Sequence, residues 1–451
     1  MKKTISLLMI TVFCFSVYAE SKWYDKPFIF PGRHRAYYKE SIEPYIIPLD
    51  FENYKECGIK VLVDKDEVFP HALQLMESAE ESIMFNMYLF GGKLGEKIIK
   101  ILKSKMEQGV KVYCVLPEPK DSISDGEVQE FFEEDFFRNT TRSGEVVKPP
   151  YYEKISLAVS AGLPVVHAET KFLDTPGLVK IDHSKIIIVD SKIAMIGGMN
   201  FADTVAKNRD SMVEVVGPYV EEIEKVFINN WICGYANEKD YSKISKFNRN
   251  ESENIMKNRI STRGYLKAEA VTTVTAPYGN NTKEALIRMF DNAKNSIYIE
   301  QLLFNEKDIL KSVAKAAKRG VVVKILLDPA IHLYSLDWKG GPNNKAVGVF
   351  QKLNKEKPEL DAEVRHYDIL PGQELHMKLS IVDGEYVGLG STNFTSGAMR
   401  SNYEAFTIFK SRELAYVYEN IFMDDWENRS VKPAKLNFGE KIIGVFSDIL
   451  F

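Results

Sequence analysis

The eight residues HSKIIIVD at 183–190 decide the fold, because their pattern returns as HMKLSIVD at 376–383. Both copies read His-x-Lys-x4-Asp, and the apolar run before the acid is typical of a buried strand. Asp190 and Asp383 stand where a turn leads into the next strand, so we expect both to be structural hydrogen-bonding acids rather than catalysts. Two such motifs with matching followers are not expected by chance in a chain with seven histidines.

Each motif also predicts which side chains act together. Side chains two positions apart on a strand face the same side of the sheet, so His183 projects with Lys185, and His376 with Lys378. After each turn a Gly-Gly or Gly-Ser pair precedes an asparagine, whose amide can donate to a phosphoryl oxygen. Glycine permits close backbone approach, so the second residue of each pair is a candidate for substrate binding. These followers are Gly198 and Asn200 in the first copy, and Ser391 and Asn393 in the second.

The repeat extends well beyond the two motifs. Helical spacing of apolar residues over 72–79 is followed by the strand-like run 82–90, and the same order returns at 286–293 and 296–304. A second amphipathic helix, a glycine that can end it in a left-handed conformation, and a short apolar strand follow in both halves. Strands alternating with helices of this length indicate α/β units with a largely buried sheet.

We therefore predict an α/β protein made of two pseudo-twofold-related α/β/α halves, each with a mixed β-sheet flanked by helices. At 451 residues the chain suits two units of roughly 200 residues each. The expected parts are a signal peptide at 1–19, an N-terminal extension at 20–65, a first half at 66–240, a linker at 241–265, a second half at 266–430 and a C-terminal tail at 431–451.

Two such strands meeting around one site would bring together two imidazoles, two ammonium groups and two amides. That set fits cleavage of a phosphodiester: one neutral histidine attacks phosphorus, and the other, protonated, gives its proton to the leaving alcohol. The lysines and asparagines would stabilise charge on the non-bridging oxygens, as Mg²⁺ does elsewhere. We expect no metal and no cofactor, because the sequence lacks His-Glu-x-x-His, paired cysteines and clustered aspartates.

A histidine nucleophile needs an acceptor that fixes its tautomer and orientation. Asp210 falls 27 residues after His183, and Glu404 falls 28 residues after His376. Near-equal offsets are what a symmetric pair of orienting carboxylates would give. Glu214 is the alternative to Asp210, since it shares the same strand face.

The first 19 residues read as an export signal, with two lysines, an apolar run too short to span a bilayer comfortably, and Ala19 before a polar stretch. An uncleaved anchor is the alternative. Cleavage would remove Lys2 and Lys3 and no acid, changing the net charge from −4 to −6. An acidic chain is a poor partner for a polyphosphate backbone, which weighs against nucleic acid. The remaining Cys57, Cys114 and Cys233 allow at most one disulfide.

At these residues the chain resembles the phospholipase D superfamily, whose hallmark is the duplicated His-x-Lys-x4-Asp motif with a trailing Gly-Gly/Ser-x-Asn. Within it, the chain is most similar to bacterial cardiolipin synthases, over nearly all of residues 66–430. The resemblance implies a double displacement through a phosphohistidine, with His183 as nucleophile, His376 as acid/base, and Asp210 and Glu404 orienting them. Cardiolipin synthases usually carry Asn and Arg beside the first motif histidine, where this chain has Asp182 and Ser184.

Three functions compete at this point. The first is an exported phospholipase D or cardiolipin-synthase-like phosphatidyltransferase, acting on glycerophospholipids at the periplasmic or external membrane face, peripheral to the membrane and compatible with a monomer. The second is an exported nuclease of the same superfamily. The third is a lipid-binding protein without activity, against which the complete motifs argue. Acidic charge and the absence of an Arg-rich tract favour lipid over nucleic acid.

Overall fold

The structure of the chain is a computed structural model in which residues 43–117, 139–140, 146–147, 163–168, 171–172, 179–234, 241–329, 341–442 and 444 are described. The expected signal peptide at 1–19 lies outside these residues. The α-helices and strands belong to one compact unit, Tyr45–Phe451. Within the described parts of the chain, none of the helices has the length and apolarity needed to cross a bilayer.

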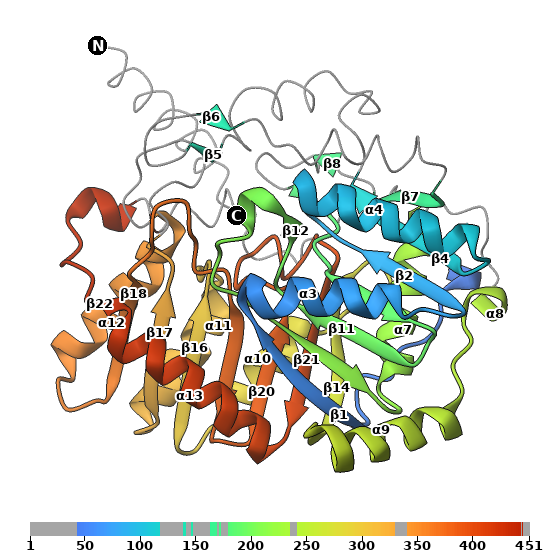
Figure 1. Cartoon of the computed structure of the whole chain (residues 1–451). Coiled ribbons are helices and arrows are strands. Elements are labelled where there is room, and N and C mark those ends of the chain that lie inside the picture. The colour runs from blue at the N-terminus through green and yellow to red at the C-terminus, as the bar shows by residue number, and fades with distance from the viewer. Residues whose placement is uncertain are drawn as a thin grey trace. The chain divides into compact units, whose positions relative to one another are not determined.

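Most strands join one mixed sheet, and its order repeats outward from a central pair (Figure 1). The order is β22-β18-β17-β16-β19-β20-β21-β14-β1-β13-β11-β10-β2-β4-β7. Antiparallel pairing of β1 (Lys55–Val63) with β14 (Leu266–Ala276) joins the halves. Outward from this pair, β13-β11-β10-β2-β4-β7 on one side matches β21-β20-β19-β16-β17-β18 on the other. The predicted fold class of two related α/β halves is confirmed.

The elements of the first half follow the predicted helix and strand order. They are β1 and then α3 (Asp64–Glu77), β2 (Ser82–Asn86), β3 (Phe90–Gly91), α4 (Gly92–Glu107), β4 (Lys111–Pro117), β7 (Val165–Ala168), β10 (Ile186–Val189), β11 (Ile193–Gly197), β12 (Phe201–Ala202), β13 (Ser211–Val216) and α7 (Val220–Cys233). The two-residue strands β5 (Asn139–Thr140), β6 (Val146–Val147), β8 (Lys171–Phe172) and β9 (Val179–Lys180) pair outside the main sheet.

The second half repeats that order after two connecting helices. The elements are α8 (Tyr241–Ile244), α9 (Arg249–Arg263), β14, β15 (Gly279–Asn280), α10 (Thr282–Asp291), β16 (Ser296–Gln301), α11 (Lys307–Lys318), β17 (Val322–Leu327), α12 (Asn344–Glu356), β18 (Ala362–Tyr367), β19 (Lys378–Val382), β20 (Tyr386–Gly390), β21 (Glu404–Lys410), α13 (Arg412–Asn428) and β22 (Ser430–Val431). The range 241–265, expected to be a linker, therefore contains α8 and α9. β1 lies in the expected extension 20–65 and takes the place in the first half that β14 takes in the second. The domain boundaries stay a prediction.

Helices cover both faces of each half-sheet, as alternate side chains of the strands show. Ile297 and Ile299 of β16 lie in a core with α10, α11 and α12, whereas Tyr298 between them stacks on Phe422 of α13 with ring centroids 5.2 Å apart. In the first half Cys114 of β4 joins the core with α3 and α4, and the neighbouring Tyr113 contacts α7. This strict alternation places the motif strands, β10 and β19, inside a three-layered packing.

Two predicted local features are confirmed by the backbone. Gly109 and Gly320, which follow α4 and α11, have φ angles of 93° and 95°. A residue with a side chain would be strained at such positive φ values, so glycine ends both helices there. Cys57, Cys114 and Cys233 are buried free thiols.

Candidate active site

The motif histidines stand just before the strands β10 and β19, at the same end of each half-sheet. These strands lie inside the sheet, each hydrogen-bonded to a neighbour on both sides. His183 and His376 are each 6% exposed, and Lys185 and Lys378 are fully buried. Each lysine ammonium donates to the backbone carbonyl of the histidine two residues before it, which keeps the pair together as the strand parity predicts.

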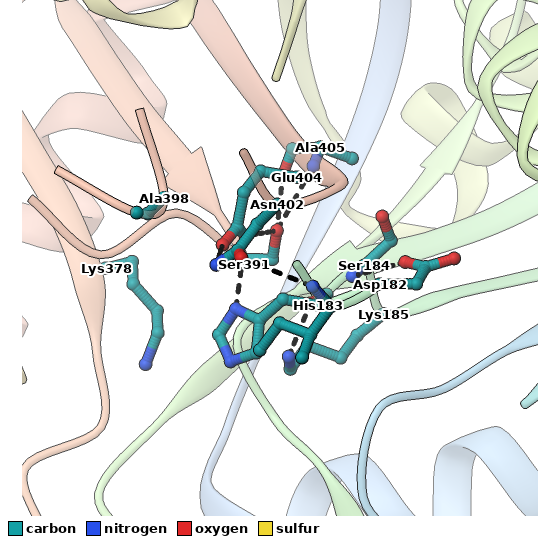
Figure 2. Close-up of polar contacts among 12 residues, drawn as sticks. Asp182, His183, Ser184, Lys185, Lys378, Ser391, Ala398, Asn402, Glu404 and Ala405 are labelled. Atoms are coloured by element: carbon teal, nitrogen blue, oxygen red, sulfur yellow. Dashed lines mark hydrogen bonds and ion pairs between the residues drawn. The ribbon is translucent and has the colours of Figure 1, made fainter. Parts of the chain in front are cut away.

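Each histidine contacts the carboxylate of the opposite half. His183 Nδ1 lies 3.1 Å from Glu404 Oε2, and His376 Nδ1 lies 2.6 Å from Asp210 Oδ2. Figure 2 shows the first of these contacts, with the His183 ring between Lys378 on its left and Lys185 on its right. The two acids identified from their near-equal offsets thus each contact a motif histidine, but each contacts the histidine of the other half; their orienting role stays a prediction. Each histidine–acid pair therefore takes one residue from each half, and the two pairs form one composite site.

Backbone pairing between the halves produces this exchange. The residue before each acid bridges to the residue before the other half's histidine: Tyr403 to Asp182, and Arg209 to Leu375. His183 N donates to Tyr403 O at 2.9 Å, and Arg209 O accepts from His376 N at 2.8 Å. Because these bonds fix the chains just before the functional side chains, the imidazole and carboxylate groups are positioned by main-chain geometry.

The two motif aspartates lie at the other end of their strands and bind backbone. Asp190 accepts hydrogen bonds from the amides of Glu80, Glu81 and Ser82. Asp383 accepts from the corresponding amides of residues 294–296. Both acids have φ near 56°, a left-handed conformation that Asp tolerates better than most residues. This geometry ties each motif strand to the start of its neighbour, β2 or β16.

Gly198 and Ser391 adjoin the two orienting acids. A Cβ on Gly198 would lie 2.4 Å from Asp210 Oδ1, so only glycine leaves room for that carboxylate. Ser391 has space for its side chain, and its hydroxyl donates to Glu404 Oε2. The predicted contact of these two residues with substrate stays a prediction, because their described contacts are with the acids.

The two motif asparagines differ in their surroundings. Asn200 is buried, and its Oδ1 accepts from the Leu89 amide at 3.1 Å. Asn393 is half-buried, and within the described residues its Oδ1 has no hydrogen-bond partner. The two motif asparagines are thus not equivalent, since only the Asn200 carbonyl has a described hydrogen-bond partner.

Burial and neighbouring charges shift the protonation of the whole site. Burial and then the charges of Lys185 and Lys378 hold the pKa of His183 well below its usual value, and burial with Lys378 lowers the pKa of His376 to about 4. Burial lowers the pKa of Lys185 to about 7 and that of Lys378 to about 8, although nearby carboxylates oppose the shift. Burial raises the pKa of Glu404 to about 7. Charges of one half act on groups of the other, so the two half-sites are electrostatically coupled.

The alternative acid, Glu214, serves another cluster. Its carboxylate contacts His71 and accepts from Arg259 at 2.9 Å and from the Tyr265 hydroxyl. His71 is a half-buried residue of α3. Glu214 is held away from the motif histidines by these partners.

Sequence reasoning missed Tyr88. Its ring packs edge-on against His183 with centroids 4.9 Å apart, and the Lys185 ammonium lies 5.1 Å from the ring centroid. The corresponding position of the second half is Leu302. The only signal was an aromatic residue at the end of the strand before the motif, which a core role explains equally well.

Comparisons with known proteins agree with this geometry. The family model described as cardiolipin synthase, phospholipase-D-like domain, matches residues 72–231 and 286–426. Cardiolipin synthase of Clostridium perfringens is 23% identical over 418 residues, covering 87% of this chain and 77% of that protein. Cardiolipin synthase of Listeria monocytogenes is 22% identical over 376 residues, covering 81% and 68%.

The fold is also similar to that of a solved enzyme. The crystal structure of phosphatidylserine synthase from Haemophilus influenzae superimposes with a TM-score of 0.58 over 88% of this chain and 94% of that one, at 13% identity. The two segments matched by the family model make up more than half of the chain, and each contains one His-x-Lys-x4-Asp motif. The chain therefore belongs to the phospholipase-D-like family of cardiolipin synthases and is an enzyme of the phospholipase D type.

Proposed function

We propose that the protein transfers the phosphatidyl group of a glycerophospholipid to water or to a lipid alcohol through a covalent phosphohistidine. The observation that carries the proposal is the exchanged pairing of His183 with Glu404 and of His376 with Asp210. In each pair the carboxylate takes Nδ1, so the ring can present Nε2 to the substrate. Two such nitrogens around one phosphorus provide a nucleophile and an acid.

The reaction then has two displacements. His183 Nε2 attacks phosphorus while the bond to the leaving alcohol breaks, and protonated His376 gives its proton to that alcohol oxygen. His376, now neutral, takes a proton from the acceptor hydroxyl, whose oxygen attacks phosphorus and releases His183. We assign attack to His183 because burial and two lysines disfavour its protonated form. His376 has the shorter carboxylate contact, at 2.6 Å, which stabilises its imidazolium.

Binding of the anionic phosphodiester would change the protonation of the site. Burial and the lysines lower the pKa values of both imidazoles and so favour their neutral forms at pH 7. A bound phosphodiester anion favours protonation of one imidazole and of both lysines. Lys185 and Lys378 then stabilise the non-bridging oxygens, and we propose that the reaction needs no metal ion.

The direct test uses lipid substrates and site variants. Purified protein is incubated with phosphatidylglycerol vesicles in EDTA, and products are separated by chromatography. Phosphatidic acid would identify water as the acceptor, and cardiolipin a lipid alcohol. His183→Asn and His376→Asn should each lower turnover by about 10³-fold or more. Nicking of single-stranded DNA without any lipid product would instead support the nuclease alternative.

A second test separates the roles of the two histidines. An activated diester with a p-nitrophenolate leaving group does not need protonation on departure. His376→Asn should therefore still release about one equivalent of nitrophenolate in a burst and hold an acid-labile phosphoryl label, whereas His183→Asn should do neither. The reverse result would exchange the two assignments.

We also propose that the enzyme is exported and works peripherally at the outer face of the membrane. Residues 1–19 carry the basic start, the short apolar run and Ala19 that support cleavage by a signal peptidase. Mass spectrometry of the protein from fractionated cells should find a chain beginning at Glu20. A cytoplasmic protein that retains Met1 or Lys2 would contradict this.

A further inference from the structure

The two half-sites rest on different supports, and the support of His183 is a chain of amide side chains that ends at Asp182. The Tyr278 hydroxyl donates to Asn230 Oδ1. Asn230 Nδ2 donates to Asn86 Oδ1 at 2.9 Å, and Asn86 Nδ2 to Asp182 Oδ2 at 3.3 Å. Asp182 adjoins His183, and burial raises its pKa to about 6. Neutral amides therefore support this side.

The support of His376 contains charged residues at the corresponding positions. The paired bridges and the repeated sequence order show which positions correspond. Arg209 stands where the other half has Tyr403, Asp425 where it has Asn230, and Glu300 where it has Asn86. Arg209 Nε donates to Asp425 Oδ2 at 2.8 Å, and Nη1 donates to Asp64 Oδ2 at 2.7 Å. Arg209 is only 9% exposed and Asp425 is fully buried. Burial opposes the Arg209 charge, but Asp425 and Asp64 raise its pKa above the usual value.

Glu300 is a further acidic residue whose charge acts on Arg209. It is fully buried, and neither of its carboxylate oxygens has a hydrogen-bond partner among the described residues. Burial and then the charge of Asp425 hold its pKa well above the usual range. Burial and the neighbouring Asp425 charge thus favour the neutral form of Glu300 beside the Arg209–Asp425 pair.

The main chain connects this charged support to the site. Asp64 N donates to Asp210 O at 2.9 Å, and Asp210 N donates to Asp64 Oδ1 at 3.1 Å. Arg209 N donates to Glu374 O at 2.9 Å, and Arg209 O accepts from His376 N at 2.8 Å. The Arg209–Asp210 dipeptide is thus held by Asp64 on one side and by the strand of His376 on the other. Movement of the Arg209 side chain would move both groups of the Asp210–His376 contact.

We propose that Arg209, held by Asp425 and Asp64, is a positioning residue that fixes Asp210 on His376 and so controls the acid/base half-site. We call Arg209, Asp425 and Asp64 the Arg209 clamp. The assignment of acid/base chemistry to His376 rests on the proposed function, whereas the positioning itself does not.

The charged groups around the clamp are few. Lys378, Asp210 and Glu374 act on His376. Asp425, Asp64 and Glu300 act on Arg209, with Arg429 and Tyr367 nearby. Asp210 favours the protonated form of His376, by charge and by hydrogen bond, against burial and Lys378. Loss of the clamp should therefore lower the pKa of His376 further.

The test variant is Arg209→Met/Asp425→Asn, because removing Arg209 alone would leave a buried charge unpaired. Asn already occupies the corresponding position 230 of the other half, so the fold accepts it there. The matched control is Arg259→Met/Glu214→Gln, which removes an Arg–carboxylate pair 2.9 Å apart with side-chain exposures of 18% and 1%. Both pairs are partly desolvated, but only the first is bonded to the Asp210–His376 segment.

The first readout is the pH profile of turnover on the phosphodiester. The clamp variant should lose about 100-fold in kcat with little change in KM, as expected for about 1 Å of misplacement. The alkaline limb of this pH profile reports the pKa of the general acid, and it should move to lower pH. In an Asp210→Asn background the clamp substitutions should cost little more, since they act through Asp210. An unchanged profile, additive losses, or the same shift in the control would overturn the proposal.

The second readout does not need activity. The proton on His376 Nδ1, bonded to Asp210 at 2.6 Å, should give a downfield NMR resonance that Asp210→Asn removes. The clamp variant should lose or shift this resonance, and the control should keep it. A resonance unmoved in the folded clamp variant would refute the positioning role. Wild-type protein inactive on every diester, with the clamp effect on this resonance present, would instead refute only the proposed function.

Discussion

Replacement of Gly198 by alanine should disable one histidine through its partner. The added Cβ would lie 2.4 Å from Asp210 Oδ1 and 3.0 Å from its Cγ, about 1 Å inside ordinary van der Waals contact. The methyl group cannot move away, because it is fixed to the backbone beside β13. The Asp210 carboxylate must therefore shift by about the same distance.

The magnitude follows from the contact that is lost. His376 Nδ1 and Asp210 Oδ2 are 2.6 Å apart, and a shift of about 1 Å takes them to a separation at which no hydrogen bond remains. A hydrogen bond to a charged group contributes about 1.5–3 kcal/mol. If that stabilisation is felt fully in the transition state, kcat should fall about 10- to 150-fold. The pKa of His376 should fall as well, because Asp210 raises it.

The assay is steady-state turnover of phosphatidylglycerol between pH 5 and 9, with circular dichroism to establish folding. Ser391→Ala is the matched control: it stands at the corresponding position, introduces no clash, and removes only the hydroxyl that donates to Glu404. We expect a loss of less than about 10-fold for the control. Wild-type turnover by a folded Gly198→Ala protein would refute the reasoning, and so would equal losses in the two variants.

Four further predictions concern stability and binding. Asp190→Ala should lower the free energy of unfolding by about 2–4 kcal/mol in urea titrations, because three backbone amides lose their acceptor. Lys185→Met should abolish turnover yet raise the melting temperature at pH 6: burial lowers the Lys185 pKa to about 7, so its charge opposes folding below that pH, and wild-type stability should rise between pH 7 and the unfolded value of 10.5. Asn200→Ala should cost about 1–2 kcal/mol of stability by leaving the Leu89 amide without its acceptor. Asn393→Ala, whose Oδ1 has no described partner, should leave the urea midpoint nearly unchanged and raise KM for the lipid.

The sequence by itself determined the local features of the site. Side chains alternate with a period of two residues along a strand, which places His183 and Lys185 on the same face. The repeat of the motif at His376 predicts a second His/Lys pair. The turn position of Asp190 predicted a backbone-binding acid, and the glycine after each amphipathic helix predicted the left-handed end. These features depend on neighbouring residues along the chain, so periodicity and turn chemistry suffice to predict them.

Only the tertiary structure decided which acid serves which histidine. Offsets of 27 and 28 residues identify Asp210 and Glu404 as equivalent, but they contain no information on how the half-sheets meet. The bridges between residues 182 and 403 and between 209 and 375 exchange the acids, because they pair backbone segments that are distant in sequence. The contact of Arg209 with Asp425 spans 216 residues for the same reason. Strand pairing across the two halves is set by packing of the whole sheet, and no local pattern encodes it.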